Sequence, residues 1–222
     1  MLEVELKCAM TPEMWPKLRQ LLQSMYKQSI KKSRDTYYDT PHLRFLRHPR
    51  SVFVRLREEQ HLQLKFDEQE GDGEQMPCVE RGFLIVDDHL PAIAGQLFRF
   101  FLPGWQSAST WSQAIQCNEL EVLASIEKMR TCYTDGTMLV SVDQVAGLGE
   151  FVEAEVECEE GTETQEALTH VQAFISDLGG TPLQAGYTEL WLYKNNPQAY
   201  AQVPERFRVD ENATMMCFIE RR

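Results

Sequence analysis

An alternation of polar and apolar residues opens the chain, where residues 3–7 read Glu-Val-Glu-Leu-Lys. Successive side chains of a strand point to opposite faces, so Glu3, Glu5 and Lys7 share one face and the two apolar residues share the other. The same alternation recurs as RLR (55–57), QLK (63–65), KMR (128–130) and EAEVE (153–157). The pattern predicts a sheet with one apolar and one charged face.

The spacing of turn residues between these runs favours strands joined as antiparallel hairpins. We expect strands near residues 2–9, 29–39, 51–58, 61–68, 77–86, 119–134, 137–146 and 150–159. Asp135 and Gly136 predict a two-residue hairpin turn.

Helical patterns fill the remaining stretches. Thr11 and Pro12 are suited to open a helix, and its expected apolar stripe consists of Leu18, Leu21, Leu22 and Met25. Further helices are expected at 89–102 with Asp88 as N-cap, at 107–117, at 163–178 with a stop at Gly179-Gly180, and from about Tyr187.

The length of 222 residues and a hydrophobic content of 43% suit one compact domain, since no Ser/Gly-rich linker interrupts the pattern. We expect this domain at 1–195 and a C-terminal tail at 196–222, to which no role is assigned. Six cysteines without zinc-site spacing are expected to be reduced thiols. Neither a signal peptide nor a membrane span is predicted, which favours the cytoplasm and no membrane partner.

Like charges stand side by side on two of the predicted strands, Arg55 with Arg57 and Lys128 with Arg130. Such pairs repel unless a counter-ion lies between them. A solvated face is the simpler interpretation of any one pair. If the strands close into a barrel, however, the charged faces converge on its interior, and such a lumen suits a polyphosphate with a divalent metal.

The net charge of -12 argues against nucleic acid as a partner. Much of the acidic excess falls in predicted turns and helices, whereas the paired cations fall on predicted strands. A small anionic ligand therefore stays compatible with the composition.

Several motifs in a fixed order resemble the CYTH superfamily of triphosphate tunnel enzymes over roughly residues 1–195. They are EVELK (3–7), RDTYYDTP (34–41), VRLRE (54–58), QLKF (63–66), IEKMR (126–130), VSVDQVAGLGEFVEAEVE (140–157) and GYTELW (186–191). RDTYYDTP is especially similar to thiamine triphosphatases. The resemblance implies an α+β fold in which a closed antiparallel β-barrel, the triphosphate tunnel, has helices packed outside.

The resemblance also implies a metal-dependent hydrolase of thiamine triphosphate or inorganic triphosphate. Guanidinium and ammonium groups suit phosphate oxygens, and the expected substrate-binding cations are Lys7, Arg55, Arg57, Lys65, Lys128 and Arg130. Lys7, Arg57 and Lys65 are expected to be catalytic.

Magnesium, with manganese as a substitute, takes hard oxygen ligands. The expected ligands are Glu3, Glu5, Asp143, Glu153 and Glu155, the first two facing the last two across the lumen; Glu157 shares their face and could exchange roles with them. We hypothesise that one metal bridges phosphate oxygens while a second metal or a carboxylate orients the attacking water.

Two other functions stay open. One is a class IV adenylyl cyclase that forms cyclic AMP and pyrophosphate, which segment 140–151 does not exclude. The other is a non-catalytic module that binds triphosphate or polyphosphate, because this chain reads Gln184-Ala185-Gly186-Tyr187 where many members carry a basic residue. Glu80 and Arg81 partly match acidic and basic positions of the family, but the sequence does not place them in register with the other strands. Phe53 could stack on a ring of the substrate or pack in the core. The oligomeric state is open.

Overall fold

The computed structural model describes residues 2–67, 78–158, 165–183, 185–205 and 208. Nine strands are described: β1 (Leu2–Ala9), β2 (Tyr26–Asp39), β3 (Phe53–Arg57), β4 (His61–Asp67), β5 (Cys78–Leu84), β6 (Glu121–Thr134), β7 (Leu139–Val145), β8 (Gly149–Cys158) and β9 (Pro182–Leu183). The described helices are α1 (Trp15–Leu21), α2 (Ala92–Phe101), α3 (Trp111–Cys117), α4 (Gln165–Leu178), α5 (Tyr187–Asn195) and α6 (Pro197–Tyr200), with 3-10 turns η1 (Pro12–Met14) and η2 (Leu22–Ser24).

Hydrogen bonds join the strands into one antiparallel sheet in the order β5-β4-β3-β2-β6-β7-β8-β1-β9. The α+β class is therefore confirmed. Strands β5 and β9 stand at the two ends of this order, and over the described residues the sheet is not closed. The expected closed barrel is thus not confirmed. Each described helix falls short of the length and apolar character that crossing a membrane requires.

The chain divides into two compact units. Unit 1 comprises the described residues within 2–33 and 127–187, and unit 2 comprises those within 34–126 and 188–208. The division of the chain into a domain at 1–195 and a tail stays a prediction. Within the predicted tail, Ala199 and Val203 are buried in an apolar cluster of unit 2, whereas residues 209–222 lie outside the described part.

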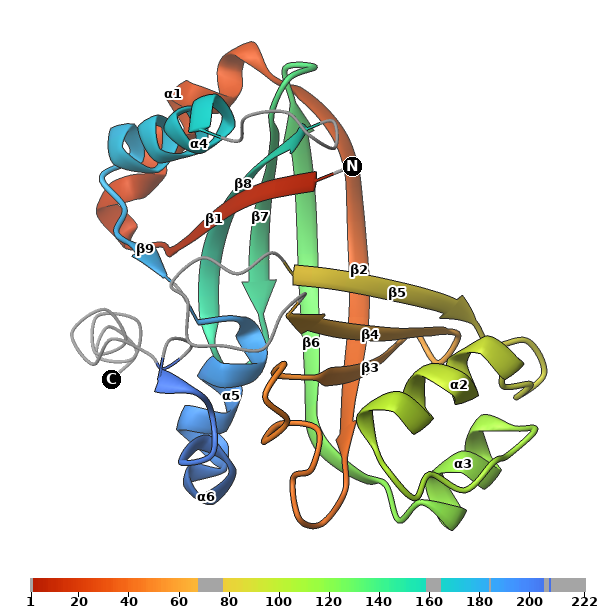
Figure 1. The fold of residues 1–222 in the computed structure, drawn as a ribbon. Helices are drawn as coiled ribbons and strands as arrows, with labels where there is room; N and C mark the ends of the chain where they lie inside the picture. Colours follow the sequence, from red (N-terminus) through yellow and green to blue (C-terminus); the bar gives the residue numbers. More distant parts are fainter. Residues whose placement is uncertain (1, 68–77, 159–164, 184, 206–207, 209–222) are drawn as a thin grey trace. The chain divides into compact units, whose positions relative to one another are not determined.

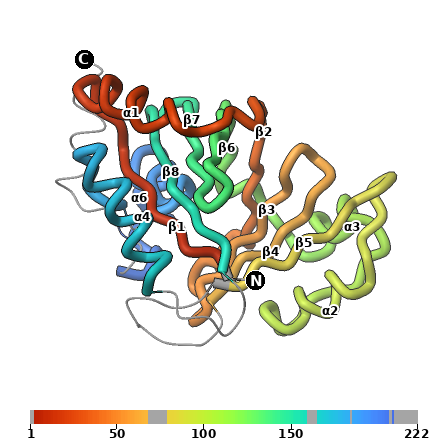
Figure 2. Tube along the Cα trace, turned by 90° about the horizontal axis from the view of Figure 1, so that it is seen from above, coloured from red at the N-terminus to blue at the C-terminus, as the bar shows by residue number. Residues whose placement is uncertain are grey.

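In unit 1, helices α1 and α4 pack against β1 and β8 (Figure 1), and the view in Figure 2 places α4 alongside β1. The predicted apolar stripe is confirmed, because Leu18 is fully buried and Leu21, Leu22 and Met25 pack against the same core. That core is completed by apolar residues of β7 and β8 such as Val140 and Val152. The opposite face of these strands carries Asp143 and Glu153 together with apolar residues such as Phe151.

In unit 2, the apolar faces of β3 and β4 pack against α2 and α3. Val54 and Leu64 from the strands meet Phe98 and Trp111 from the helices, and the rings of Phe98 and Trp105 stack at 4.4 Å. The alternation predicted for these strands is therefore confirmed. A smaller cluster contains Leu46 and Leu192.

The predicted helix at 89–102 begins later, at Ala92, and Asp88 does not cap it. Val86 and His89 form an antiparallel bridge that holds this segment extended. The Asp88 carboxylate instead accepts from the backbone N–H of Ser112 at 3.1 Å, in the first turn of α3. Asp88 thus contributes to the start of a different helix from the one that we expected.

The predicted two-residue turn at Asp135-Gly136 is wrong, because Thr134 pairs with Leu139 and four residues connect β6 to β7. The Asp135 carboxylate accepts from the backbone N–H groups of Thr137 and Met138, both at 2.8 Å. These side-chain bonds stabilise the longer turn.

Gly180, where the chain leaves α4, is tightly surrounded. A Cβ atom there would lie 2.7 Å from Cys8 Sγ and 3.2 Å from Met14 Cε. We expect Gly180→Ala to lower the free energy of unfolding by roughly 1–3 kcal/mol through overpacking, measured by urea denaturation. Gly95→Ala is the control, since a Cβ there meets nothing within 4 Å; an equal loss in both variants would contradict the packing argument.

Candidate functional site

Three carboxylates of β1 and β8 form a cluster that we call the acidic triad: Glu3, Glu5 and Glu155. One ligand oxygen from each lies within 4.8 Å of the others. The two strands are antiparallel neighbours, and Glu5 pairs directly with Glu155. The expectation that these residues face each other across a lumen is therefore wrong. They meet because the strands are adjacent.

The triad brings like charges together at the surface of the protein. Glu3 and Glu5 are exposed and Glu155 is half-buried. Burial, together with the charges of Glu153 and Glu5, raises the pKa of Glu155. Like charges in directly opposed positions destabilise a sheet, and a divalent cation would remove that repulsion. Three carboxylates also match the hard oxygen donors that Mg²⁺ and Mn²⁺ take.

The next position on the same face of β1, two residues after Glu5, belongs to a second group, the Asp143 cluster. It consists of Lys7, Lys128, Arg130, Asp143, Glu153 and Tyr187. Arg130 donates two hydrogen bonds to Asp143, from Nε to Oδ1 at 2.8 Å and from NH2 to Oδ2 at 2.6 Å. Its NH2 also donates to Glu153 at 2.8 Å. Glu153 in turn pairs with Lys7 at 3.2 Å, and Asp143 pairs with Lys128 at 3.9 Å.

Charge pairing dominates the ionisation of this cluster. Burial alone would raise the pKa of Glu153, but Lys7, Arg130 and Lys128 lower it to about 2. Burial alone would lower the pKa of Arg130, but the hydrogen bonds that Arg130 donates to Asp143 and the charge of Glu153 raise it above its usual range. Both groups are therefore ionised at neutral pH.

Tyr187 is a member of this cluster that the sequence did not single out as a site residue. Its hydroxyl donates to Asp143 Oδ2 at 2.7 Å. The Nζ atoms of Lys7 and Lys128 lie 4.4 Å and 5.2 Å from the centroid of its ring. Burial and the charges of Asp143 and Glu153 raise the pKa of Tyr187 well above its usual value, so the phenol stays protonated.

Unit 2 contains a corresponding arrangement, the Asp35 cluster, made of Asp35, Arg55, Arg57, Gln63 and Glu80. Arg57 donates two hydrogen bonds to Asp35, from Nε to Oδ1 at 2.7 Å and from NH2 to Oδ2 at 3.0 Å. Arg55 NH1 lies 3.6 Å from the same carboxylate. The counter-ion that two adjacent arginines require is therefore Asp35, which is buried.

Glu80, which the sequence left without a register, belongs to this cluster. It pairs in register with Lys65, accepts from Arg55 NH2 at 3.4 Å and accepts from the side-chain amide of Gln63. Lys65 is exposed on β4. Phe53 packs against an apolar cluster of unit 2, which agrees with the core alternative.

The RDTYYDTP segment explains how β2 positions these groups. Asp35, Tyr37 and Asp39 share one strand face. Tyr38 on the other face meets the Trp111 ring edge-on at 5.3 Å. The alternation of side chains along β2 puts Asp35 on the same face as Asp39, and this signal in the sequence could have identified Asp35 as a site residue. Its partner on β3, however, is set by strand pairing.

Asp39 has a local structural role. Its carboxylate accepts from the backbone N–H groups of Phe45 at 3.0 Å and Leu46 at 2.8 Å. Burial raises the pKa of Asp39 although these hydrogen bonds oppose the shift. The second aspartate of the motif therefore fixes the loop after β2.

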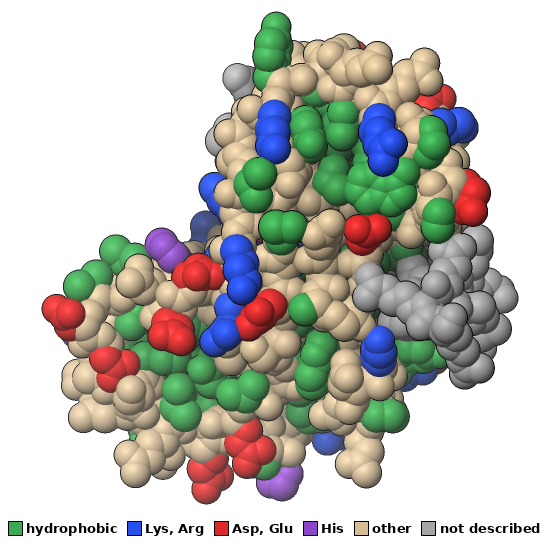
Figure 3. Space-filling model, turned by 180° about the vertical axis from the view of Figure 1, so that it is seen from behind, with side chains coloured by type: hydrophobic (Ala, Val, Ile, Leu, Met, Phe, Trp, Pro, Cys, Tyr) green, Lys and Arg blue, Asp and Glu red, His purple; other side chains and the backbone are tan. Residues whose placement is uncertain are grey.

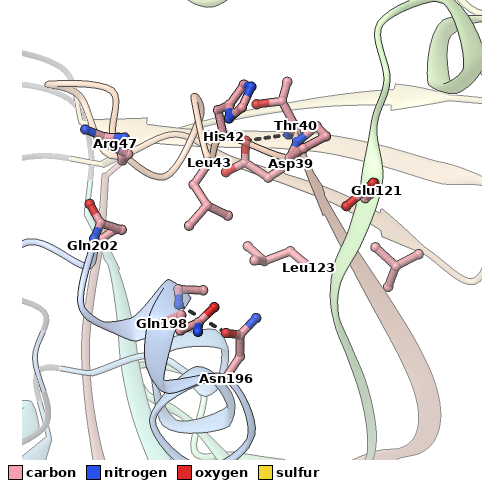
Figure 4. Close-up of a pocket in the computed structure, with 13 residues that line it drawn as sticks. Asp39, Thr40, His42, Leu43, Arg47, Glu121, Leu123, Asn196, Gln198 and Gln202 are labelled. Carbon is pink, nitrogen blue, oxygen red and sulfur yellow. Dashed lines mark hydrogen bonds between the residues drawn. The ribbon is translucent and has the colours of Figure 1, made fainter.

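A cavity of about 570 Å³ lies beside this loop in unit 2. Figure 4 shows Leu43 and Leu123 pointing into it, with Arg47, Glu121 and Gln202 around its edge. Its lining includes no predicted substrate-binding or metal-binding residue among those described. On the face of the molecule in Figure 3, basic and acidic side chains are interspersed among apolar ones, so charge there is mixed in sign.

A comparison with protein families assigns residues 1–184 to the CYTH domain. The chain belongs to the CYTH family. CYTH-domain proteins act on triphosphates, and the triphosphate tunnel metalloenzymes among them use divalent metals. No curated protein matches the chain.

Solved structures share the fold of this CYTH protein. PH1819 from Pyrococcus horikoshii OT3 is 20% identical, with a TM-score of 0.59 over 87% of this chain and 99% of that one. An adenylate cyclase-like protein from Vibrio parahaemolyticus is 15% identical, with a TM-score of 0.53 over 86% and 97%. HpAC1 from Hippeastrum, an adenylyl cyclase candidate described as having a dominant triphosphatase activity, is 14% identical, with a TM-score of 0.52 over 86% and 94%.

Glu153→Gln should destabilise this CYTH protein at neutral pH, because Lys7 and Arg130 lose a buried counter-charge. We expect a loss of about 3 kcal/mol in the free energy of unfolding at pH 7. The ionised Glu153 stabilises the fold above its ordinary pKa of 4.5, and this contribution is lost as the pH falls toward about 2. The difference between variant and wild type, measured by urea denaturation, should therefore shrink below pH 4.5; a constant difference would contradict the pairing.

The acidic triad should bind Mn²⁺, and Glu5→Gln should weaken that binding at least roughly tenfold, since one charged ligand is lost. Titration calorimetry without any phosphate compound measures this. Glu166→Gln, which removes an exposed charge from α4, is the matched control. Glu157→Gln tests the register, because loss of binding there with Glu155→Gln unaffected would move the site by two residues.

Proposed function

We propose that this CYTH protein is a metal-dependent triphosphatase whose substrate is thiamine triphosphate or inorganic triphosphate. The observation that carries the proposal is the order of groups along β1 and β8. The acidic triad is followed, two residue pairs further along the strands, by Lys7 paired with Glu153. Two residues of a strand span about 7 Å, so a site for a divalent cation lies directly beside a group of cations.

In this proposal, the residues of unit 1 have three different roles. Glu3, Glu5 and Glu155 hold Mg²⁺, or Mn²⁺ in its place, and the bound ion supplies positive charge that polarises phosphate oxygens. Lys7, Lys128 and Arg130 bind phosphate oxygens and neutralise their charge. Asp143 and Glu153 form ion pairs with these cations and keep them in place; their role as metal ligands stays a prediction.

Unit 2, considered by itself, contains the other proposed substrate-binding residues. Arg57 presents a guanidinium that is already oriented by Asp35, and about a third of its side chain stays exposed (32%). A guanidinium fixed in this way loses little side-chain freedom when it binds phosphate. Arg55 and Lys65 complete the proposed set, and Arg57 and Lys65, with Lys7, are the proposed catalytic residues.

An adenylyl cyclase is the alternative enzyme. HpAC1 is named as an adenylyl cyclase candidate and is described as having a dominant triphosphatase activity, so likeness of fold is compatible with either reaction. The resemblance of RDTYYDTP to thiamine triphosphatases supports hydrolysis. We place the activity in the cytoplasm, acting on a small molecule.

A substrate panel tests the proposal. Thiamine triphosphate, inorganic triphosphate and ATP are each supplied with Mg²⁺ or Mn²⁺, and phosphate, pyrophosphate and cyclic AMP are measured. We expect metal-dependent release of phosphate from one of the first two, lost on addition of EDTA. Cyclic AMP with pyrophosphate would support the cyclase instead. Tight binding of triphosphate without turnover would support the non-catalytic module.

Arg57→Ala should lower kcat/KM for the hydrolysed substrate at least roughly tenfold, which corresponds to about 1.4 kcal/mol of transition-state stabilisation. Arg57→Lys should recover only part of the activity, because an ammonium group cannot bond Asp35 and a phosphate with the same fork. Arg19→Ala, an exposed arginine of α1, is the control. Unchanged turnover of Arg57→Ala would exclude its assigned role.

A further inference from the structure

Tyr187 lies in the GYTELW segment (186–191) that closes the series of motifs along the chain. It is the first residue of α5, and only 9% of its surface is exposed. Phe151 packs edge-on against its ring at 5.1 Å. A buried phenol needs a hydrogen-bond partner, and here the partner is the fully buried carboxylate of Asp143.

Asp143 is engaged on both oxygens. Oδ1 accepts from Arg130 Nε, and Oδ2 accepts from Arg130 NH2 and from the Tyr187 hydroxyl. Lys128 Nζ lies 3.9 Å from the same Oδ2. A carboxylate surrounded in this way has a fixed orientation, and the orientation of Arg130 follows from it.

The ring of Tyr187 contacts two further cations. The ammonium groups of Lys7 and Lys128 lie within 4.4 Å and 5.2 Å of its centroid, close enough for cation–π attraction. One side chain therefore contacts two of the three cations of this cluster directly and reaches the third, Arg130, through Asp143.

Charge explains what a tyrosine can do here that a lysine cannot. Lys7, Lys128 and Arg130 carry three positive charges and Asp143 and Glu153 carry two negative charges, so the cluster has a formal charge of +1. A neutral phenol donates a hydrogen bond without changing this total. A fourth cation would add repulsion among side chains that are already crowded.

We propose that Tyr187 is a positioning residue for the triphosphate: its hydroxyl orients Arg130 through Asp143, and its ring holds Lys7 and Lys128. The inference rests on the proposed function and deepens it. Tyr187 takes no part in the chemistry itself. It fixes the places of the cations before the polyanion arrives, so less ordering is needed on binding.

Tyr187→Phe removes only the hydroxyl and is the main test. We expect kcat to fall by about tenfold or more with the hydrolysed substrate, while KM changes less than about threefold, because a misoriented Arg130 costs most when charge moves toward the leaving group. Tyr187→Leu, which also removes the ring, should raise KM as well. Tyr26→Phe, at a tyrosine that is 77% exposed, is the matched control.

A double-mutant cycle separates positioning from a general effect on stability. If Tyr187 acts through Asp143 and Arg130, adding Tyr187→Phe to Arg130→Lys should lower kcat by less than half of what it does alone. A purely structural tyrosine would give additive losses and parallel losses in thermal midpoint. Wild-type kcat and KM in Tyr187→Phe, or additive losses, would overturn the positioning role while leaving the triphosphatase intact.

Metal-free binding of inorganic triphosphate, measured by calorimetry, distinguishes the two proposals. If the wild type binds triphosphate but does not hydrolyse any substrate of the panel, the triphosphatase is excluded, and a weaker affinity of Tyr187→Leu than of Tyr26→Phe still supports positioning. Equal affinities would overturn it. If the wild type neither binds nor hydrolyses triphosphate, both proposals are overturned.

Discussion

A buried aspartate that holds two neighbouring cations is the interaction on which the candidate site depends, and it occurs once in each unit. Asp35 lies directly across from Arg57 in the pairing of β2 with β3, and Asp143 lies directly across from Arg130 in the pairing of β7 with β6. Both carboxylate oxygens of each aspartate accept hydrogen bonds from its arginine. Each also lies near the cation two residues earlier, Arg55 or Lys128.

This arrangement resolves the repulsion between like charges on one strand face. Each pair of cations shares one carboxylate, which stabilises their positive charges. Because that carboxylate is buried, the guanidinium groups of Arg57 and Arg130 that bind it keep a fixed orientation. The environment of the acidic triad is different. There, Glu5 and Glu155 are paired like charges that no cation in the described part of the molecule is shown to separate. A cluster of carboxylates and the Lys7–Glu153 ion pair thus lie next to each other on the same two strands.

The fold supports this arrangement through the alternation of the strands. Apolar residues of β1, β7 and β8 pack under α1 and α4 in unit 1, and those of β3 and β4 pack under α2 and α3 in unit 2. The charged residues of the same strands must then lie on the other face. A shift of one residue in register would bury the charges and expose the core, so core packing also fixes the site.

The sequence by itself determined the strands, their charged faces and the cations, because these depend on period-2 alternation, which is a local property. It also indicated that Arg55 and Arg57, or Lys128 and Arg130, need a counter-ion. Only the tertiary structure decided which residues meet that need. Asp35 and Asp143 accept hydrogen bonds from their arginines on neighbouring strands, across 22 and 13 residues of chain, and Tyr187 of α5 donates to Asp143 across 44 residues. The closure of the expected barrel and the facing of Glu5 and Glu155 likewise depend on which strands are neighbours, and strand order is a non-local property that alternation does not encode.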